Sequence, residues 1–207
     1  MTHMPLAVRP ATPADPADAL LYLSAKPYYD AYAGSESRAR SMLSAVYARP
    51  GHAASFEVCE VAELEGELAG VIAWFPVSEG DPRARRFVSL TAPRMPVWRW
   101  PALLRHLRAA GTVSPHPPPG SLYVDALAVD PAFRRRGVAT ELLQRAEAFA
   151  SAQGLDGVAL DTGLHNEAAR ALYQANGYAE RDIRRAASPA VAEAIGGPGF
   201  VSYLKRL

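Results

Sequence analysis

Hydrophobic residues follow two distinct periods along the chain, and these periods predict where strands and helices lie. Alternating or short continuous apolar runs, typical of β-strands, occupy seven segments: residues 6–9, 56–64, 67–75, 122–129, 158–162, 183–186 and 200–204. Apolar residues spaced three to four apart, typical of amphipathic helices, occupy five: residues 14–23, 35–48, 102–110, 140–153 and 167–176. Glu65 and Gly66 separate two of the strands and predict a hairpin. The pattern indicates an α/β protein.

The length and the apolar content fit a single domain over residues 1–207. The 207 residues are 49% hydrophobic, which is ample for one packed core, and no internal repeat is found. Residues 81–120 interrupt the regular pattern as a Pro/Arg-rich insertion, because eight of the 18 prolines fall there with seven arginines and one acidic residue, Asp81. Trp98, Trp100 and the helical pattern that follows them argue against disorder. The insertion is an ordered connector with a solvated basic face, a wall or lid of a substrate site, or a subunit contact.

Charge, cysteine and histidine usage exclude several classes of function. The 22 basic and 21 acidic residues nearly cancel, so duplex nucleic acid receives no support as a partner, although residues 81–108 are locally basic. The single cysteine, Cys59, cannot form an intrachain disulfide and is best explained as a small buried hydrophobe. A metal site is not expected from the scattered histidines, which are His3, His52, His106, His116 and His165. Because the chain has neither an 18-residue apolar stretch nor a signal-like N-terminus, we expect a cytoplasmic protein without a membrane partner.

An arginine-rich turn between a strand and a helix is a candidate phosphate-binding loop. Its residues are Arg134, Arg135, Arg136, Gly137, Val138, Ala139 and Thr140. Glycine lets the backbone approach an anion, and the free N–H groups at the start of the following helix then face that anion. A solvated run of charges explains the arginines equally simply. A P-loop is disfavoured because no Lys-Ser/Thr pair follows Gly137, and the dinucleotide fingerprint is absent.

A second group of residues lies about 30 positions further along the chain. Asn166 and Tyr173 are seven residues apart, which places both on one face of a helix, so one ligand can touch both. Asn166 also suits a simple helix N-cap, and Tyr173 also suits a core aromatic. His165 precedes the cap and is either a solvated loop residue or a ligand contact.

Together these two motifs resemble the GNAT superfamily of acyl-CoA-dependent N-acetyltransferases. Arg134, Gly137 and Ala139 are similar to the family's Arg/Gln-x-x-Gly-x-Gly/Ala pyrophosphate loop. The other motif is similar to Asn-x-x-Ala-x-x-Leu-Tyr-x-x-x-Gly-Phe/Tyr, with one difference of spacing, through Asn166, Ala169, Leu172, Tyr173, Gly177 and Tyr178. The resemblance implies the GNAT fold: a mixed, mostly antiparallel sheet of about seven strands, with splayed fourth and fifth strands and helices on both faces.

The resemblance also implies how acetyl-CoA would be bound, without a metal. The backbone groups of Leu127, Ala128 and Val129 would hold the pantetheine arm, and an N–H near Leu127 would hydrogen-bond the thioester oxygen. Asn166 and the loop over residues 134–140 would bind the rest of the cosubstrate. The Tyr173 hydroxyl would point at the thioester sulfur.

An amine acceptor requires a group that takes up its proton. Strand alternation would place Tyr123, Asp125, Leu127 and Val129 on one face, so Asp125 is the candidate general base and Tyr123 a pocket-lining residue. A carboxylate paired with an arginine is the alternative role for Asp125. Tyr28, Tyr29 and Tyr32 are candidate acceptor contacts, although core packing explains them equally well. The excess of arginine hints at an acceptor that carries carboxylate or phosphate.

The sequence therefore predicts an enzyme that transfers an acetyl group from acetyl-CoA to a primary amine of a small molecule or peptide. The amine would attack the thioester directly in a ternary complex. A non-catalytic acyl-CoA-binding or regulatory module is the alternative, and the presence of Tyr173 together with Asp125 argues against it. A homodimer is consistent with the resemblance.

Overall fold

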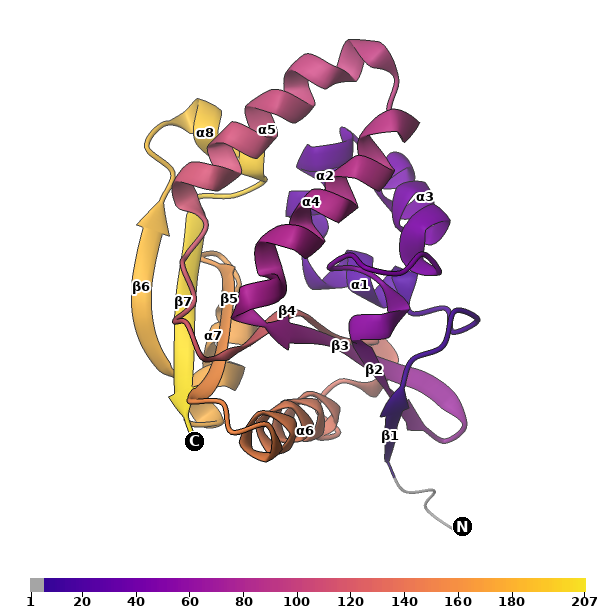
Figure 1. Cartoon of the computed structure of the whole chain (residues 1–207), viewed down its shortest axis with the longest axis vertical. Helices are drawn as coiled ribbons and strands as arrows, with labels where there is room; N and C mark the ends of the chain where they lie inside the picture. The colour runs from indigo at the N-terminus through magenta and orange to yellow at the C-terminus, as the bar shows by residue number, and fades with distance from the viewer. Residues whose placement is uncertain (1–5) are drawn as a thin grey trace.

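The computed structural model describes residues 6–207, so His3 lies outside the described part of the chain. These residues form a seven-stranded sheet and eight α-helices (Figure 1). The strands are β1 (Ala7–Pro10), β2 (Cys59–Leu64), β3 (Glu67–Pro76), β4 (Leu122–Val129), β5 (Gly157–Gly163), β6 (Ala179–Arg185) and β7 (Gly199–Arg206). The helices are α1 (Asp18–Ser24), α2 (Lys26–Ala33), α3 (Glu36–Tyr47), α4 (Gly80–Thr91), α5 (Trp100–Val113), α6 (Val138–Ala152), α7 (Glu167–Ala175) and α8 (Pro189–Ile195).

The sheet has the order β1-β2-β3-β4-β5-β7-β6, and every neighbouring pair is antiparallel except β4 and β5. This arrangement confirms the predicted mixed, mostly antiparallel sheet. The predicted hairpin between β2 and β3 is also confirmed, because Glu65 and Gly66 both take positive φ values, 60° and 82°, as a two-residue hairpin turn requires.

Helices cover both faces of the sheet, and each face has its own hydrophobic core. On one face α6 packs against β3, β4 and β5, and its buried residues include Leu142 and Leu143. On the other face α1, α2 and α3 enclose the second core around Tyr22 and Leu43. Figure 1 shows α6 on the opposite side of the sheet from α2, α3 and α4. The sheet therefore separates two apolar layers, and the predicted helices on both of its faces are confirmed.

Three helices and one strand differ from the sequence prediction. α2 and α8 were not predicted as separate helices, since each is short and begins with a proline in its first turn. α4 lies at the start of the Pro/Arg-rich segment and was not predicted as a helix; its Pro82 stands in the first turn, where a missing N–H costs nothing. β6 begins four residues earlier than the predicted 183–186, because this edge strand is polar and mostly exposed and lacks a hydrophobic alternation.

The Pro/Arg-rich segment is thus largely helical. α4 and α5 are joined by two short 3-10 turns, Ala92–Arg94 and Val97–Arg99. α5 packs against α8 and α2, at the end of the molecule beyond the carboxyl end of β5 (Figure 1). The segment therefore forms an ordered wall beside the β6–β7 connection. No helix within residues 6–207 is both long enough and apolar enough to cross a bilayer.

Candidate active site

The two parallel strands at the centre of the sheet part at a β-bulge. β4 and β5 pair only from Leu122 to Val124, opposite residues 158–160, and the strands then diverge. On its other side β4 stays paired with β3, but the register shifts so that Ala73 faces Ala126 and Trp74 faces Val124. Asp125 is the extra residue of this bulge. Backbone groups of β4 beyond Asp125 that point toward β5 therefore have no partner strand.

The bulge corrects the expected alternation along β4. Tyr123 belongs to the core beneath α1–α3 together with Ala126 and Ala128, whereas Leu127 and Val129 pack on the α6 side with Val124. Tyr123 therefore does not share a face with Leu127 and Val129, as simple alternation predicted. The extra residue at the bulge reverses the orientation of every side chain that follows it.

A cavity of about 180 Å³ occupies the gap between the parted strands. Residues 124–127 of β4 and 161–163 of β5 form its walls, with residues 23–28 of the α1–α2 corner, part of α7 and the loop before β7. We call it the catalytic cavity. Of the predicted site residues it brings together five: Tyr28, Asp125, Leu127, Asn166 and Tyr173.

Two carboxylates lie side by side on the parted strands, and both line the catalytic cavity. Asp125 and Asp161 follow directly after the paired residues Val124 and Leu160 of the two strands. Burial in the surrounding protein, followed by the charge of Asp161, raises the pKa of Asp125 to about 7. The Asp125 side chain is nevertheless accessible, because water inside the cavity can reach it. No arginine contributes to its pKa, so the alternative role in an arginine pair receives no support.

Asp161 is a site residue that sequence reasoning missed. Its pKa is raised to about 6 by burial, and a hydrogen bond that Tyr123 donates to its Oδ2 at 2.6 Å opposes this shift. Tyr123, predicted to line the pocket, does not line the catalytic cavity and instead holds Asp161 in place. A charged residue inside the short apolar run of residues 158–162 was the available signal.

The motif helix α7 supplies the opposite wall. Asn166 caps it: Oδ1 accepts from the Ala169 N–H at 3.2 Å, and Nδ2 donates to Thr162 Oγ1 at 3.1 Å. Tyr173 is 5% exposed, and within residues 6–207 its hydroxyl makes no hydrogen bond to the protein. Burial, followed by the charge of Asp161, raises the pKa of Tyr173. This phenol is therefore neutral, faces the cavity and has a free donor.

The aromatic residues of α2 take different positions. Tyr28 lines the catalytic cavity, and its ring lies 4.6 Å from the buried His106 ring of α5. Tyr29 and Tyr32 are buried and do not line this cavity. The Tyr32 hydroxyl lies 2.6 Å from Oγ1 of Thr91, which is the packing role that the sequence left open.

The arginine-rich loop lies at the start of α6, outside the catalytic cavity. Gly137 has a φ of 83° and no side chain caps the first turn of α6, so the amides of residues 138–140 receive no side-chain acceptor. Arg136 forms an ion pair with Glu65, and Arg134 Nε donates to the Val129 carbonyl at 3.4 Å. All three arginines are exposed. Ala128, Val129 and residues 134–140 are thus not brought to the cavity that contains Asp125.

Comparison with known proteins identifies the fold. The chain matches the "Acetyltransferase (GNAT) family" over residues 19–178, about three quarters of its length. The chain belongs to the GNAT acetyltransferase family. The protein is therefore an acetyltransferase by family, and no curated protein matches it. Within residues 6–207 no cluster of three or more His, Cys, Asp or Glu side chains is arranged to hold a metal ion.

Solved structures of acetyltransferases share the GNAT fold of this chain. An N-acetyltransferase from Staphylococcus aureus Mu50 superposes with a TM-score of 0.69 at 17% identity over 96% of this chain and 100% of that one. Another acetyltransferase has a TM-score of 0.67 at 20% identity, with 97% and 98% covered. The polyamine N-acetyltransferase of Drosophila melanogaster, which forms N-acetylagmatine, has a TM-score of 0.58 at 20% identity, with 98% and 100% covered. These likenesses show a common fold.

Proposed function

We propose that this GNAT protein transfers the acetyl group of acetyl-CoA to a primary amine by direct attack in a ternary complex. The observation that carries the proposal is the convergence of Asp125 and Tyr173 on one cavity, at the point where β4 and β5 part. An accessible carboxylate and a neutral phenol with a free donor are the two proton-handling groups that such a transfer needs.

Asp125 acts as the general base, directly or through water. An alkylammonium with a pKa near 10.4 is deprotonated only about once in a few thousand molecules at pH 7, so a base must remove its proton. A carboxylate whose pKa lies at about 7 is well matched to that task. The amine nitrogen then attacks the thioester carbonyl carbon, the N–C bond forms, and the C–S bond breaks.

Tyr173 stabilises the departing thiolate. Because an ordinary phenol is a weaker acid than a thiol by about 1.5 pKa units, full proton transfer is uphill by about 2 kcal/mol. Burial raises the pKa of Tyr173, which makes transfer harder still. Its hydroxyl therefore contributes a hydrogen bond to the developing negative charge on sulfur.

Two backbone features support a bound acyl-CoA. The unpaired groups of β4 after Asp125 suit an extended pantetheine arm, with Leu127 the nearest of the predicted residues. The uncapped first turn of α6 behind Gly137 suits a pyrophosphate, and the exposed Arg134 and Arg135 lie beside it. Tyr28 is the acceptor contact that we retain from α2.

Thermal stabilisation tests the cosubstrate first. Acetyl-CoA should raise the Tm, whereas ATP and NAD should not, because only the first matches both backbone features. A panel of amines, peptides and aminoglycosides is then screened by the release of free thiol. If none of the three nucleotides raises the Tm, the proposal loses its basis. Stabilisation without thiol release from any acceptor would favour the alternative, a non-catalytic acyl-CoA binder.

A further inference from the structure

A second, larger cavity adjoins the catalytic cavity. It has a volume of about 520 Å³ and lies between α2, α5 and α8; we call it the outer cavity. Pro27 and Gly196 line both cavities, one from each side. Along α2 and α8 the lining continues from the catalytic cavity to Asp30 and Glu193 of the outer one. Pro27 and Gly196 also contact each other, because a Cβ at Gly196 would collide with the Pro27 carbonyl oxygen, so these two residues form the boundary that a ligand spanning both cavities would cross.

Two arginines line the outer cavity without an acidic partner. Arg99 precedes α5, and its guanidinium packs against Gly34, the residue that ends α2. Its Nε is buried and, within residues 6–207, has no hydrogen-bond acceptor. Arg105 lies further along α5, is exposed, and forms no ion pair in the described part of the chain. Arg99 and Arg105 therefore bring positive charge to the lining of the outer cavity.

The acidic residues of the outer cavity do not neutralise these arginines. Asp30 already accepts hydrogen bonds at both oxygens, from the Tyr22 hydroxyl at 2.8 Å and from Lys26 Nζ at 2.9 Å. Glu193 lies on α8 and forms no ion pair within residues 6–207. The charges that lack a counter-ion in this cavity are therefore two positive and one negative, and they favour an anionic ligand group.

We propose that the acceptor carries an anionic group, a carboxylate or a phosphate, that binds Arg99 and Arg105 in the outer cavity while its amine reaches Asp125. The assignment of the amine end rests on the proposed function. Guanidinium groups bind both oxyanions through charge-assisted hydrogen bonds, so the two sources share one chemistry. A bound anion would change the electrostatic surroundings of the Arg99 guanidinium, so the Nε–H signal reports on occupancy.

Side-chain NMR tests the outer cavity without requiring turnover. The Arg99 Nε–H signal is assigned with Arg99→Lys, and the wild-type protein is titrated with linear ω-amino carboxylates, from γ-aminobutyrate upward, and with ω-aminoalkyl phosphates. Each is compared with its neutral amide or alcohol. We expect an anionic member to shift the signal and its neutral counterpart to leave it unchanged. The carboxylate and phosphate arms distinguish the two sources. If no anion perturbs the signal more than its neutral counterpart, the proposal is wrong.

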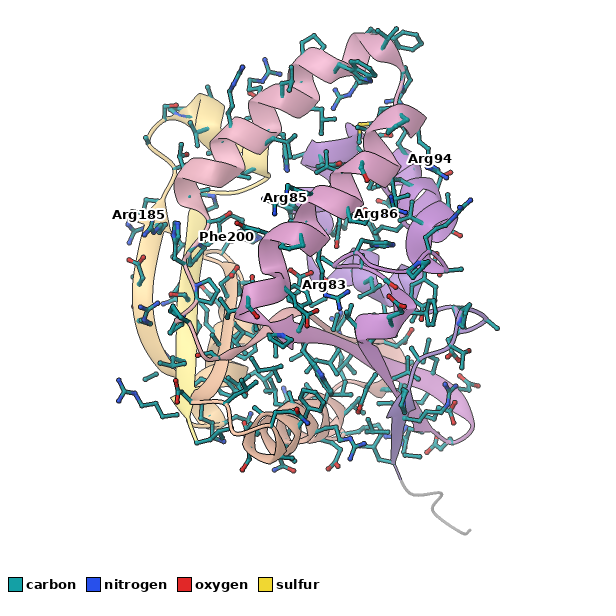
Figure 2. The ribbon with its side chains drawn as sticks, viewed as in Figure 1. Arg83, Arg85, Arg86, Arg94, Arg185 and Phe200 are labelled. Atoms are coloured by element: carbon teal, nitrogen blue, oxygen red, sulfur yellow. The ribbon has the colours of Figure 1, made fainter. Side chains whose placement is uncertain are left out.

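Thiol-release kinetics with acetyl-CoA provide the second measurement. Arg105→Gln should lower kcat/KM for the anionic amine by about tenfold, as expected for losing a hydrogen bond to a charged group, and leave the neutral amine unaffected. Arg105 is exposed, so this variant should fold. Arg85→Gln, on α4 and outside both cavities (Figure 2), removes one charge from the same segment and should change neither rate. If Arg105→Gln lowers kcat/KM equally for the anionic and the neutral amine, the proposal is wrong. If acetyl-CoA does not bind, the proposed function is wrong, and the NMR titration alone then tests anion binding in the outer cavity.

Discussion

Asp125 and Asp161 stand side by side on two parallel strands, each as the first residue after the last paired position of its strand. The pKa of each is raised, to about 7 and about 6, chiefly by the surrounding protein, and the charge of Asp161 adds to the shift at Asp125. The parting of the strands thus creates both the cavity and the proton acceptor that the proposed reaction requires.

Replacing Asp125 by Asn should change the pH dependence of the reaction. In the wild type, kcat/KM should rise as the pH increases through about 7, because the base is active only when deprotonated. In Asp125→Asn, the rate at pH 7 should fall by about 100-fold or more, and the rise should move toward the pKa of the amine itself, near 10.4. Measurement of kcat/KM across the pH range, with the thiol-release assay, checks this.

Asp161→Asn is the matched variant for the same experiment. It keeps the base but removes the negative neighbour that raises the pKa of Asp125, so the wild-type rise should move to lower pH. The amide oxygen can still accept the hydrogen bond from Tyr123. A profile that stays in place in both variants would show that the base lies elsewhere.

Tyr173→Phe should lower kcat by about tenfold to 100-fold, the loss expected for one hydrogen bond to a developing charge. The Kd for acetyl-CoA should change little, since the hydroxyl makes no hydrogen bond to the protein within residues 6–207 and the ring still packs on Tyr203 at 5.5 Å. Single-turnover rates and equilibrium titration separate the two effects. If kcat is unchanged in Tyr173→Phe, the hydroxyl does not have the proposed role.

The stability of the protein should also depend on Asp125. Its pKa is higher in the folded protein than the value of 3.8 for a free side chain, so the folded state binds the proton more tightly, and this group destabilises the protein progressively as the pH rises from about 4 to about 7. At pH 8, Asp125→Asn should therefore raise the Tm by a few degrees, about 1 kcal/mol once screening by water in the cavity is allowed for. At pH 4 the two proteins should unfold at similar temperatures. A lower Tm for the variant at pH 8 would contradict this sign.

The family and the layout of the sheet were predictable from the sequence because both depend on local signals. Gly137 and Gly177 mark loop positions that need a left-handed backbone, and the alternation of apolar residues located each central strand. The role of Asp161 was not predictable, because the parting of β4 from β5 brings it to Asp125, and no local pattern records that contact. Tyr123 was assigned to the pocket because the alternation of side chains along a strand does not reveal where a bulge inserts an extra residue.

The same limit explains the helices that were missed. α8 has only seven residues, and its stability depends on contacts with α5 and α2 rather than on its own propensity. α2 is assembled around tyrosines whose packing partners, such as Phe87, are distant in sequence. The acceptor side of the molecule is built from these tertiary contacts, which is why the outer cavity could not be foreseen.

Gly137→Ala tests the anion-binding role of the loop, against Gly154→Ala as a control. Both glycines have positive φ values, 83° and 66°, and a Cβ at either position would meet no other protein atom within 4 Å. Each substitution should therefore cost about 1 kcal/mol from the left-handed backbone alone. The Tm should fall to a similar extent in the two variants. Only the methyl group at 137, at the N-terminus of α6, would enter the space proposed for the pyrophosphate. We expect the Kd for acetyl-CoA, measured by calorimetry, to rise about tenfold or more in Gly137→Ala and to stay unchanged in Gly154→Ala. If the two variants bind acetyl-CoA with equal affinity, the loop does not bind the cosubstrate, since the backbone strain is common to both.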